Sequence, residues 1–80
     1  MKVRVRYFAS LRDRLGRAGE ELEVSPGETA RGLLDRVLGG AGVREGMPPV
    51  AFAVNLAYVS GEQPLSDGDE VAFLPPVSGG

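Results

Sequence analysis

The 80-residue sequence contains no cysteine and no histidine. Without cysteine there is no disulfide to hold the fold, no thiol nucleophile and no thiolate ligand for zinc. Without histidine, the commonest acid–base catalyst and metal ligand among side chains is missing too. Only one lysine is present, Lys2, which disfavours a protein that builds chains on its own lysines. These absences remove the common routes to catalysis by side chains and to metal binding.

Long apolar runs are missing as well. No segment has the length of a signal peptide or of a membrane-spanning helix, so we expect a cytoplasmic protein with no membrane contact. The formal net charge of -2 gives no support to nucleic-acid binding. Basic residues gather early in the chain, where the solvated outer face of a strand and a helix is favoured over a phosphate-binding face. These residues are Lys2, Arg4, Arg6, Arg12, Arg14 and Arg17.

Local patterns predict seven elements in one domain. Residues 2–8 alternate between apolar and polar side chains, residues 9–16 place two leucines four apart before a glycine, and residues 20–24 alternate again before a turn at 25–27. The clearest helix begins after Thr29, a good N-cap, and ends at the two glycines 39–40. Its apolar stripe consists of Ala30, Leu33, Leu34, Val37 and Leu38.

The second half is expected to supply the remaining strands. Residues 41–49 are expected to form a loop, residues 50–55 a strand, 56–57 a tight turn, 58–60 a short strand, 61–69 turns, and 70–74 the last strand. The Asp67-Gly68-Asp69 triplet is interpreted as a turn rather than a cation site, because hard cations need more converging oxygens.

This order favours an α+β fold, a β-grasp (ubiquitin-like) roll in which one main helix crosses one face of a mixed four- to five-stranded sheet. The last strand is expected to return to the middle of the sheet. We expect residues 1–75 to form this domain and residues 76–80 to form a flexible tail. The tail follows Pro75 and comprises Pro76, Val77, Ser78, Gly79 and Gly80. Pro75 and Pro76 stiffen the chain where the tail starts, and Gly79 and Gly80, which have no side chains, can enter a channel too narrow for any Cβ.

Two segments resemble the small subunit of molybdopterin synthase, a family of ubiquitin-like sulfur carriers. They are LSDGDEVAFLPPVSGG at residues 65–80 and VRYFASLRDRLG near the start. The thiamine-pathway carrier and ubiquitin share the Gly-Gly end but not the Pro-Pro-Val approach. The resemblance implies that a ubiquitin-activating-like adenylyltransferase joins the Gly80 carboxyl to AMP from ATP. A persulfide donor then leaves 1-thioglycine, a thiocarboxylate, at Gly80.

The same resemblance implies the acceptor and the main partner. The carrier docks on the large subunit of molybdopterin synthase, in a heterotetramer, and gives its sulfur to cyclic pyranopterin monophosphate to build the dithiolene of molybdopterin. The chain would bind no cofactor or metal and would be no enzyme by itself. For docking we expect an exposed apolar cluster on the sheet face opposite the helix, formed by Phe8, Leu74 and Tyr58.

Three other functions stay open. In the first, the chain carries sulfur for thiamine, thiolated tRNA or cysteine synthesis with the same chemistry at Gly80. In the second, it is a protein modifier joined through Gly80 to a lysine of a target. In the third it is an interaction domain with an inert tail.

Overall fold

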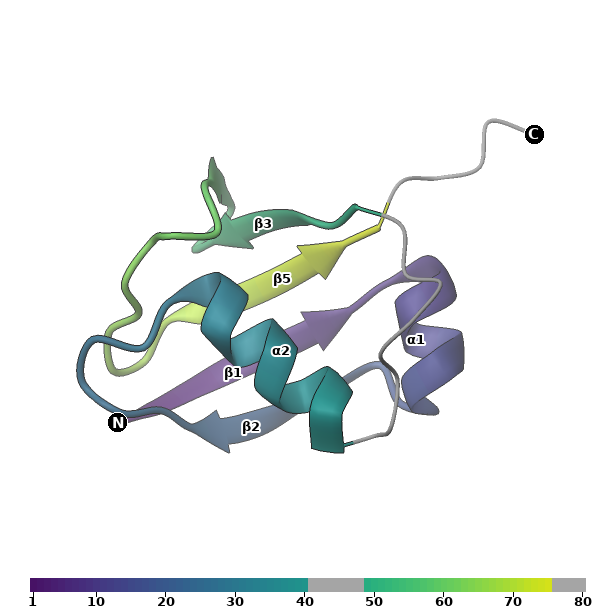
Figure 1. Ribbon diagram of the computed structural model, residues 1–80, viewed down its shortest axis with the longest axis horizontal. Helices are drawn as coiled ribbons and strands as arrows, with labels where there is room; N and C mark the ends of the chain where they lie inside the picture. The colour runs from purple at the N-terminus through teal and green to yellow at the C-terminus, as the bar shows by residue number, and fades with distance from the viewer. Residues whose placement is uncertain (41–48, 76–80) are drawn as a thin grey trace.

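The computed structural model describes residues 1–40 and 49–75, which form a mixed five-stranded sheet and two helices (Figure 1). The elements are β1 (Lys2–Tyr7), α1 (Ala9–Leu15), β2 (Gly19–Glu23), α2 (Ala30–Gly40), β3 (Ala51–Val54), β4 (Ala57–Val59) and β5 (Glu70–Leu74). The strand order is β2-β1-β5-β3-β4, with β5 parallel to β1 and every other pair antiparallel. This is the predicted β-grasp fold, with the last strand in the middle.

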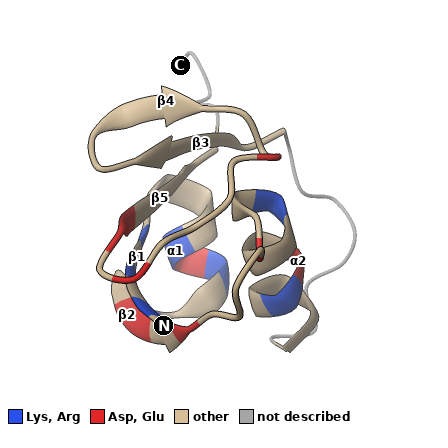
Figure 2. Cartoon of the chain, turned by 90° about the vertical axis from the view of Figure 1, so that its left-hand side faces the viewer, with Lys and Arg blue, Asp and Glu red and all other residues tan. Residues whose placement is uncertain are grey.

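The core lies between the sheet and α2, which runs across one sheet face (Figures 1 and 2). Side chains alternate in and out along β1 and β5, so each strand buries one face only. Tyr7 and Phe73 stack in this core with ring centroids 6.1 Å apart, and Phe52 meets Phe73 edge-on. Helix α1 adds Leu11 and Leu15 to the same cluster. The opposite sheet face is therefore left without a helix.

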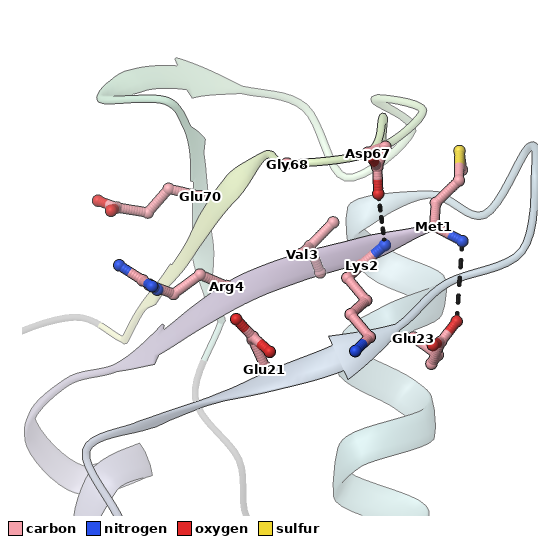
Figure 3. A pocket seen from close by; sticks show the side chains of 9 residues that line it. All are labelled: Met1, Lys2, Val3, Arg4, Glu21, Glu23, Asp67, Gly68 and Glu70. Carbon is pink, nitrogen blue, oxygen red and sulfur yellow. Dashed lines mark hydrogen bonds and ion pairs between the residues drawn. The ribbon is translucent and has the colours of Figure 1, made fainter.

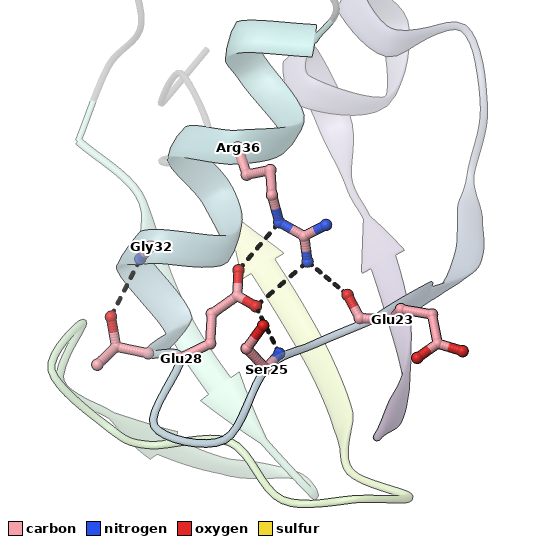
Figure 4. Close-up of polar contacts among 6 residues, drawn as sticks. Glu23, Ser25, Glu28, Gly32 and Arg36 are labelled. Carbon is pink, nitrogen blue, oxygen red and sulfur yellow. Dashed lines mark hydrogen bonds and ion pairs between the residues drawn. The ribbon is translucent and has the colours of Figure 1, made fainter.

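The start of α2 is fixed by a side-chain cap and by an ion pair. The Thr29 hydroxyl accepts a hydrogen bond from the Gly32 amide, as predicted for an N-cap (Figure 4). The Arg36 guanidinium contacts the Glu28 carboxylate at 3.0 Å and also donates to the backbone carbonyl of Glu23. Because Glu28 also accepts from the Ser25 amide, the turn at 25–27 is held against the helix.

Two predicted boundaries were wrong. The hairpin turn between β3 and β4 lies at Asn55 and Leu56, not at 56–57, and both residues have positive φ, 51° and 71°. Such a pair of values is typical of the tight turn that matches strand twist. Strand β4 lies at Ala57–Val59 rather than at 58–60. Helix α2 ends at Gly40, within the pair of glycines predicted to end it. The predicted loop at residues 41–49 lies almost wholly outside the described residues.

Candidate docking face

The open sheet face is apolar at the end where β1 and β5 finish. Because these strands are parallel and Tyr7 pairs with Phe73, the next position on each strand brings Phe8 beside Leu74. Ala51 pairs with Leu74 from the other side. The row below contains Arg6, Ala72, Ala53 and Tyr58, in that order across four strands. We call the apolar residues of these two neighbouring rows the apolar row. They are Phe8, Leu74 and Ala51 in the first row and Ala72, Ala53 and Tyr58 in the second.

The three predicted docking residues therefore share one face. Phe8 directly precedes α1 and has extended backbone angles. Its side chain is 38% exposed. Tyr58 is 80% exposed on the edge strand β4. Leu74 is partly covered. Large apolar side chains left in water beside small neighbours form a surface that a partner can cover at little cost.

Leu56 is the exposed apolar side chain that the sequence did not single out. It is 93% exposed at the tip of the β3–β4 hairpin. Because β3 runs antiparallel to β5, this tip lies at the opposite end of the sheet from Phe8 and Leu74. Leu56 therefore lies apart from the Phe8–Leu74 end of the apolar row.

The opposite end of the open face is charged (Figure 3). A shallow pocket there is lined by side chains from β1, β2, β5 and the turn before β5. They are Met1, Lys2, Val3, Arg4, Glu21, Glu23, Asp67, Gly68 and Glu70. Lys2 pairs in register with Glu23, while Arg4 lies between Glu21 and Glu70. Opposite charges thus face one another across the strands, which favours a solvated, self-compensating surface.

A polar cluster borders the core where β1 ends. The Tyr7 hydroxyl donates a 2.6 Å hydrogen bond to the Glu20 carboxylate, which also accepts from Arg17 at 2.7 Å. Burial, followed by the hydrogen bond to Glu20, raises the pKa of Tyr7 well above its usual range. Burial alone would raise the pKa of Glu20, but the hydrogen bonds from Tyr7 and Arg17 outweigh it and lower that pKa. The cluster fixes the strand end from which Phe8 projects.

The Asp67-Gly68-Asp69 segment is a turn, as predicted. Gly68 has φ of 85°, and the Asp69 amide donates to the Ser66 carbonyl. The carboxylates are used locally, since Asp67 accepts from the Lys2 amide and Asp69 accepts from the amide nitrogens of Ser66 and Asn55. In residues 1–40 and 49–75, no group of carboxylates is arranged to hold a metal ion. Within the same ranges, no helix is long and apolar enough to span a bilayer.

The predicted tail, residues 76–80, begins directly after the last described residue, Pro75. Pro75 is buried and directly follows β5, at the same sheet end as Phe8. Five predicted tail residues lie outside the described part of the chain: Pro76, Val77, Ser78, Gly79 and Gly80. The predicted domain end at 75 stays a prediction. What is described is the root of the tail, which is the central strand of the sheet.

Comparison with known proteins decides the family. The model of the ThiS family matches residues 5–80. The chain belongs to the ThiS family. The resemblance seen in residues 65–80 and near the start is thereby confirmed at the level of the family.

Curated relatives match this ThiS-family chain over its whole length. The molybdopterin synthase sulfur carrier subunit of Chlamydomonas reinhardtii is 35% identical, and the alignment covers 100% of both chains. The protein of the same name from Mycobacterium tuberculosis is 37% identical, over 100% of this chain and 99% of its own. Both alignments include the Pro-Pro and Gly-Gly segment of this chain.

Solved structures of relatives share the fold. The putative molybdopterin converting factor subunit 1 of Pyrococcus furiosus superposes with a TM-score of 0.82 at 35% identity, over 96% of this chain and 99% of its own. A chain in the protein–protein complex of subunits 1 and 2 of the Helicobacter pylori molybdopterin-converting factor superposes with a TM-score of 0.68 at 27% identity, over 100% of both chains. The small archaeal modifier protein 1 of Methanosarcina acetivorans gives 0.75 at 26% identity, over 99% of this chain and 96% of its own. Solved structures that share the fold of this chain thus include proteins named as molybdopterin converting factor subunits and a protein named as a modifier.

Proposed function

We propose that this chain is the sulfur carrier of molybdenum cofactor biosynthesis and that the Gly80 carboxyl carries the sulfur. The observation on which the proposal depends is the full-length match to two molybdopterin synthase sulfur carrier subunits, at 35% and 37% identity. Membership of the ThiS family supports it. The partner is the large subunit of molybdopterin synthase, in line with the H. pylori complex of subunits 1 and 2.

The proposed chemistry takes place at one carboxylate. An adenylyltransferase of the ubiquitin-activating type joins the Gly80 carboxylate to AMP and releases pyrophosphate from ATP. The terminal sulfur of a persulfide donor attacks the carbonyl carbon, AMP leaves, and a thiol reduces the acyl disulfide to a thiocarboxylate. That sulfur then attacks cyclic pyranopterin monophosphate on the large subunit. Water hydrolyses the resulting thioester, so the sulfur stays on the pterin and the carrier leaves as a carboxylate. A second charged carrier completes the dithiolene in the same way.

In this proposal the domain contributes position rather than acid–base groups. The sequence contains no histidine and no cysteine. The root is β5, which is hydrogen-bonded on both sides, to β1 and to β3. A root held in this way lets a partner bound to the sheet place the sulfur next to its acceptor, which makes the transfer effectively unimolecular. The chain is therefore no enzyme by itself in this scheme.

Intact-mass measurement tests the proposed chemistry directly. After incubation with the activating enzyme, ATP and a persulfide donor, we expect a gain of one sulfur for one oxygen in the full chain. The matched control omits ATP, and a chain without Gly80 should remain unchanged while its circular dichroism stays that of the folded domain. If the full chain gains no sulfur while the activating enzyme charges its own known carrier, the proposal is wrong.

The apolar row is the proposed docking site for the large subunit. Leu74→Asp should raise the Kd for that subunit by at least about 100-fold, because it places a charge in the desolvated centre of an interface. Leu56→Asp makes the same chemical change at the far end of the sheet and should leave the Kd within about 2-fold of the original. Calorimetric titration measures both values. Equal binding by the two variants would contradict the assignment.

A protein-modifier role is the second candidate function. The observation in its favour is the shared fold with the M. acetivorans modifier protein at 26% identity. In that role Gly80 would form an isopeptide bond with a lysine of a target. Gly-Gly remnants on lysines of other proteins, found by digestion and mass spectrometry in cells expressing this chain, would establish it. Carriage of sulfur for thiamine, thiolated tRNA or cysteine would instead appear as loss of those products when the chain is deleted.

A further inference from the structure

Arg6 occupies a distinct place on the open sheet face. It is exposed on β1, in the row that continues through Ala72 and Ala53 to Tyr58. Two positions further along the same strand direction lies Phe8, beside Leu74. Arg6 is therefore the charged residue that borders the apolar row, on the side nearest β2.

Arg6 differs from the two basic residues before it on the same face. Lys2 pairs in register with Glu23, and Arg4 has Glu21 on one side and Glu70 on the other. The neighbours of Arg6 in the same register are Gly19 on β2 and Ala72 on β5. Among the residues that the structure describes, the Arg6 side chain takes part in no hydrogen bond or ion pair. Charge compensation across the strands thus stops where the apolar surface begins.

The fold keeps this position uncompensated. A Cβ at residue 19 would lie 2.6 Å from the carbonyl oxygen of Val5, a contact that real structures do not contain. No side chain is accommodated at residue 19 without a shift of the backbone, so β2 cannot supply a carboxylate directly opposite Arg6. Ala72 on the other side is neutral and partly buried. The planar guanidinium, with five donors, is left to water or to another molecule.

Docking on the apolar row changes the environment of this charge. A partner that covers Phe8 and Leu74 removes water from the adjacent row, and an arginine desolvated without an acceptor costs several kcal/mol. A carboxylate on the partner removes that cost, because it accepts two parallel hydrogen bonds from a guanidinium. A partner with a lysine or an apolar side chain at this point is rejected.

We propose that Arg6 is a specificity-determining residue, which pairs with an aspartate or glutamate of the large subunit docked on the apolar row. This inference rests on the proposed function, since it names a further contact at the same docking face. It adds a charge requirement to a surface otherwise defined by apolar side chains. It also distinguishes Arg6 from Lys2 and Arg4, which have carboxylate residues directly opposite in register on the neighbouring strands.

Binding of the large subunit encoded by the same genome tests the inference. We expect Arg6→Ala to raise the Kd by about 10-fold or more and Arg6→Glu by about 100-fold or more, because reversal places two carboxylates face to face. Arg6→Lys should fall between the original chain and Arg6→Ala, since an ammonium loses the bidentate geometry. The control is Arg12→Glu on α1, a helix packed on the other side of the sheet, which should stay within about 2-fold.

Salt and rescue experiments identify the contact as a charge pair. Raising the salt concentration should weaken the original complex more than the Arg6→Ala complex. Replacing one aspartate or glutamate of the large subunit by lysine should restore binding to Arg6→Glu and weaken binding to the original chain. Scanning its acidic residues one at a time locates that carboxylate. Failure of every such replacement to restore binding would overturn the pairing.

The outcomes separate this inference from the proposed function. If Leu74→Asp abolishes binding while Arg6→Ala and Arg6→Glu bind as the original chain does, the Arg6 contact is refuted and the docking face stands. If Leu74→Asp also binds normally, the docking face itself is wrong. Thermal unfolding of every variant establishes that each is folded, so that loss of binding reports the interface.

Discussion

Removal of the Tyr7 hydroxyl tests how the strand end beneath the docking face is held. Tyr7 is 1% exposed, stacks on Phe73 and donates a 2.6 Å hydrogen bond to Glu20. Tyr7→Phe keeps the ring and its packing and deletes this one bond. Tyr58→Phe deletes the same atom from an 80% exposed side chain and is the matched control.

The expected loss follows from the surroundings of the carboxylate. A hydrogen bond to a charged group contributes about 1.5–3 kcal/mol to stability when it is removed from water. The Glu20 side chain is 26% exposed and keeps its contact with Arg17, so water and Arg17 compensate in part. We expect Tyr7→Phe to lower the free energy of unfolding by about 1–2 kcal/mol. In a domain of this size each kcal/mol lowers Tm by about 4–8 °C.

The pH dependence gives an independent signature. The pKa of Tyr7 is raised in the folded protein, so folding favours the protonated hydroxyl. The stability from this group is therefore fully present below the unfolded pKa of about 10 and is lost as the pH rises above it. The difference between the original chain and Tyr7→Phe should shrink above pH 10.

Urea unfolding monitored by circular dichroism at pH 7 and above pH 10 measures both effects. Tyr58→Phe should match the original chain at pH 7. A Tyr7→Phe chain as stable as the original at pH 7, or a difference that grows above pH 10, would refute the reasoning from the hydrogen bond.

Two further substitutions probe backbone geometry. Leu56→Asn should raise the free energy of unfolding by up to about 1 kcal/mol, because asparagine tolerates the positive φ of 71° and the exposed leucine loses no packing; Leu56→Ala keeps the strain and should show no gain. Gly19→Ala should cost about 1–3 kcal/mol, since its Cβ meets the Val5 carbonyl oxygen. Gly40→Ala, which meets no atom within 4 Å, should be neutral or stabilising, and equal stability of the two alanine variants would contradict the clash.

The fold followed from the sequence wherever a period was strict. Alternation over residues 2–8 and 70–74 assigned the buried faces correctly, and the order of elements predicted the central place of the last strand. The hairpin turn was misplaced by one residue because Asn55 was assigned to the preceding strand and Ala57 to the turn. Asn55, which adopts left-handed angles readily, was the better signal.

The site was predictable in part. The faces of Phe8 and Leu74 came from alternation alone, and their adjacency needed only the β1–β5 pairing. The surroundings of Arg6 needed the register of β1 against β2, which depends on α1 and the residues between α1 and β2 and has no local sequence signature. The hydrogen bond from Tyr7 to Glu20 was not predicted for the same reason, since the two residues meet only when that register is set.

The central position of β5 has a consequence for synthesis of the protein. Residues 70–74 are made after every other strand, yet they join β1 to β3 and supply Phe73 to the middle of the core. Until they leave the ribosome the nascent chain lacks the strand that joins the β1–β2 pair to the β3–β4 pair, and the surface that these strands form together does not exist. An enzyme that selects its substrate by that surface therefore never modifies an unfinished chain.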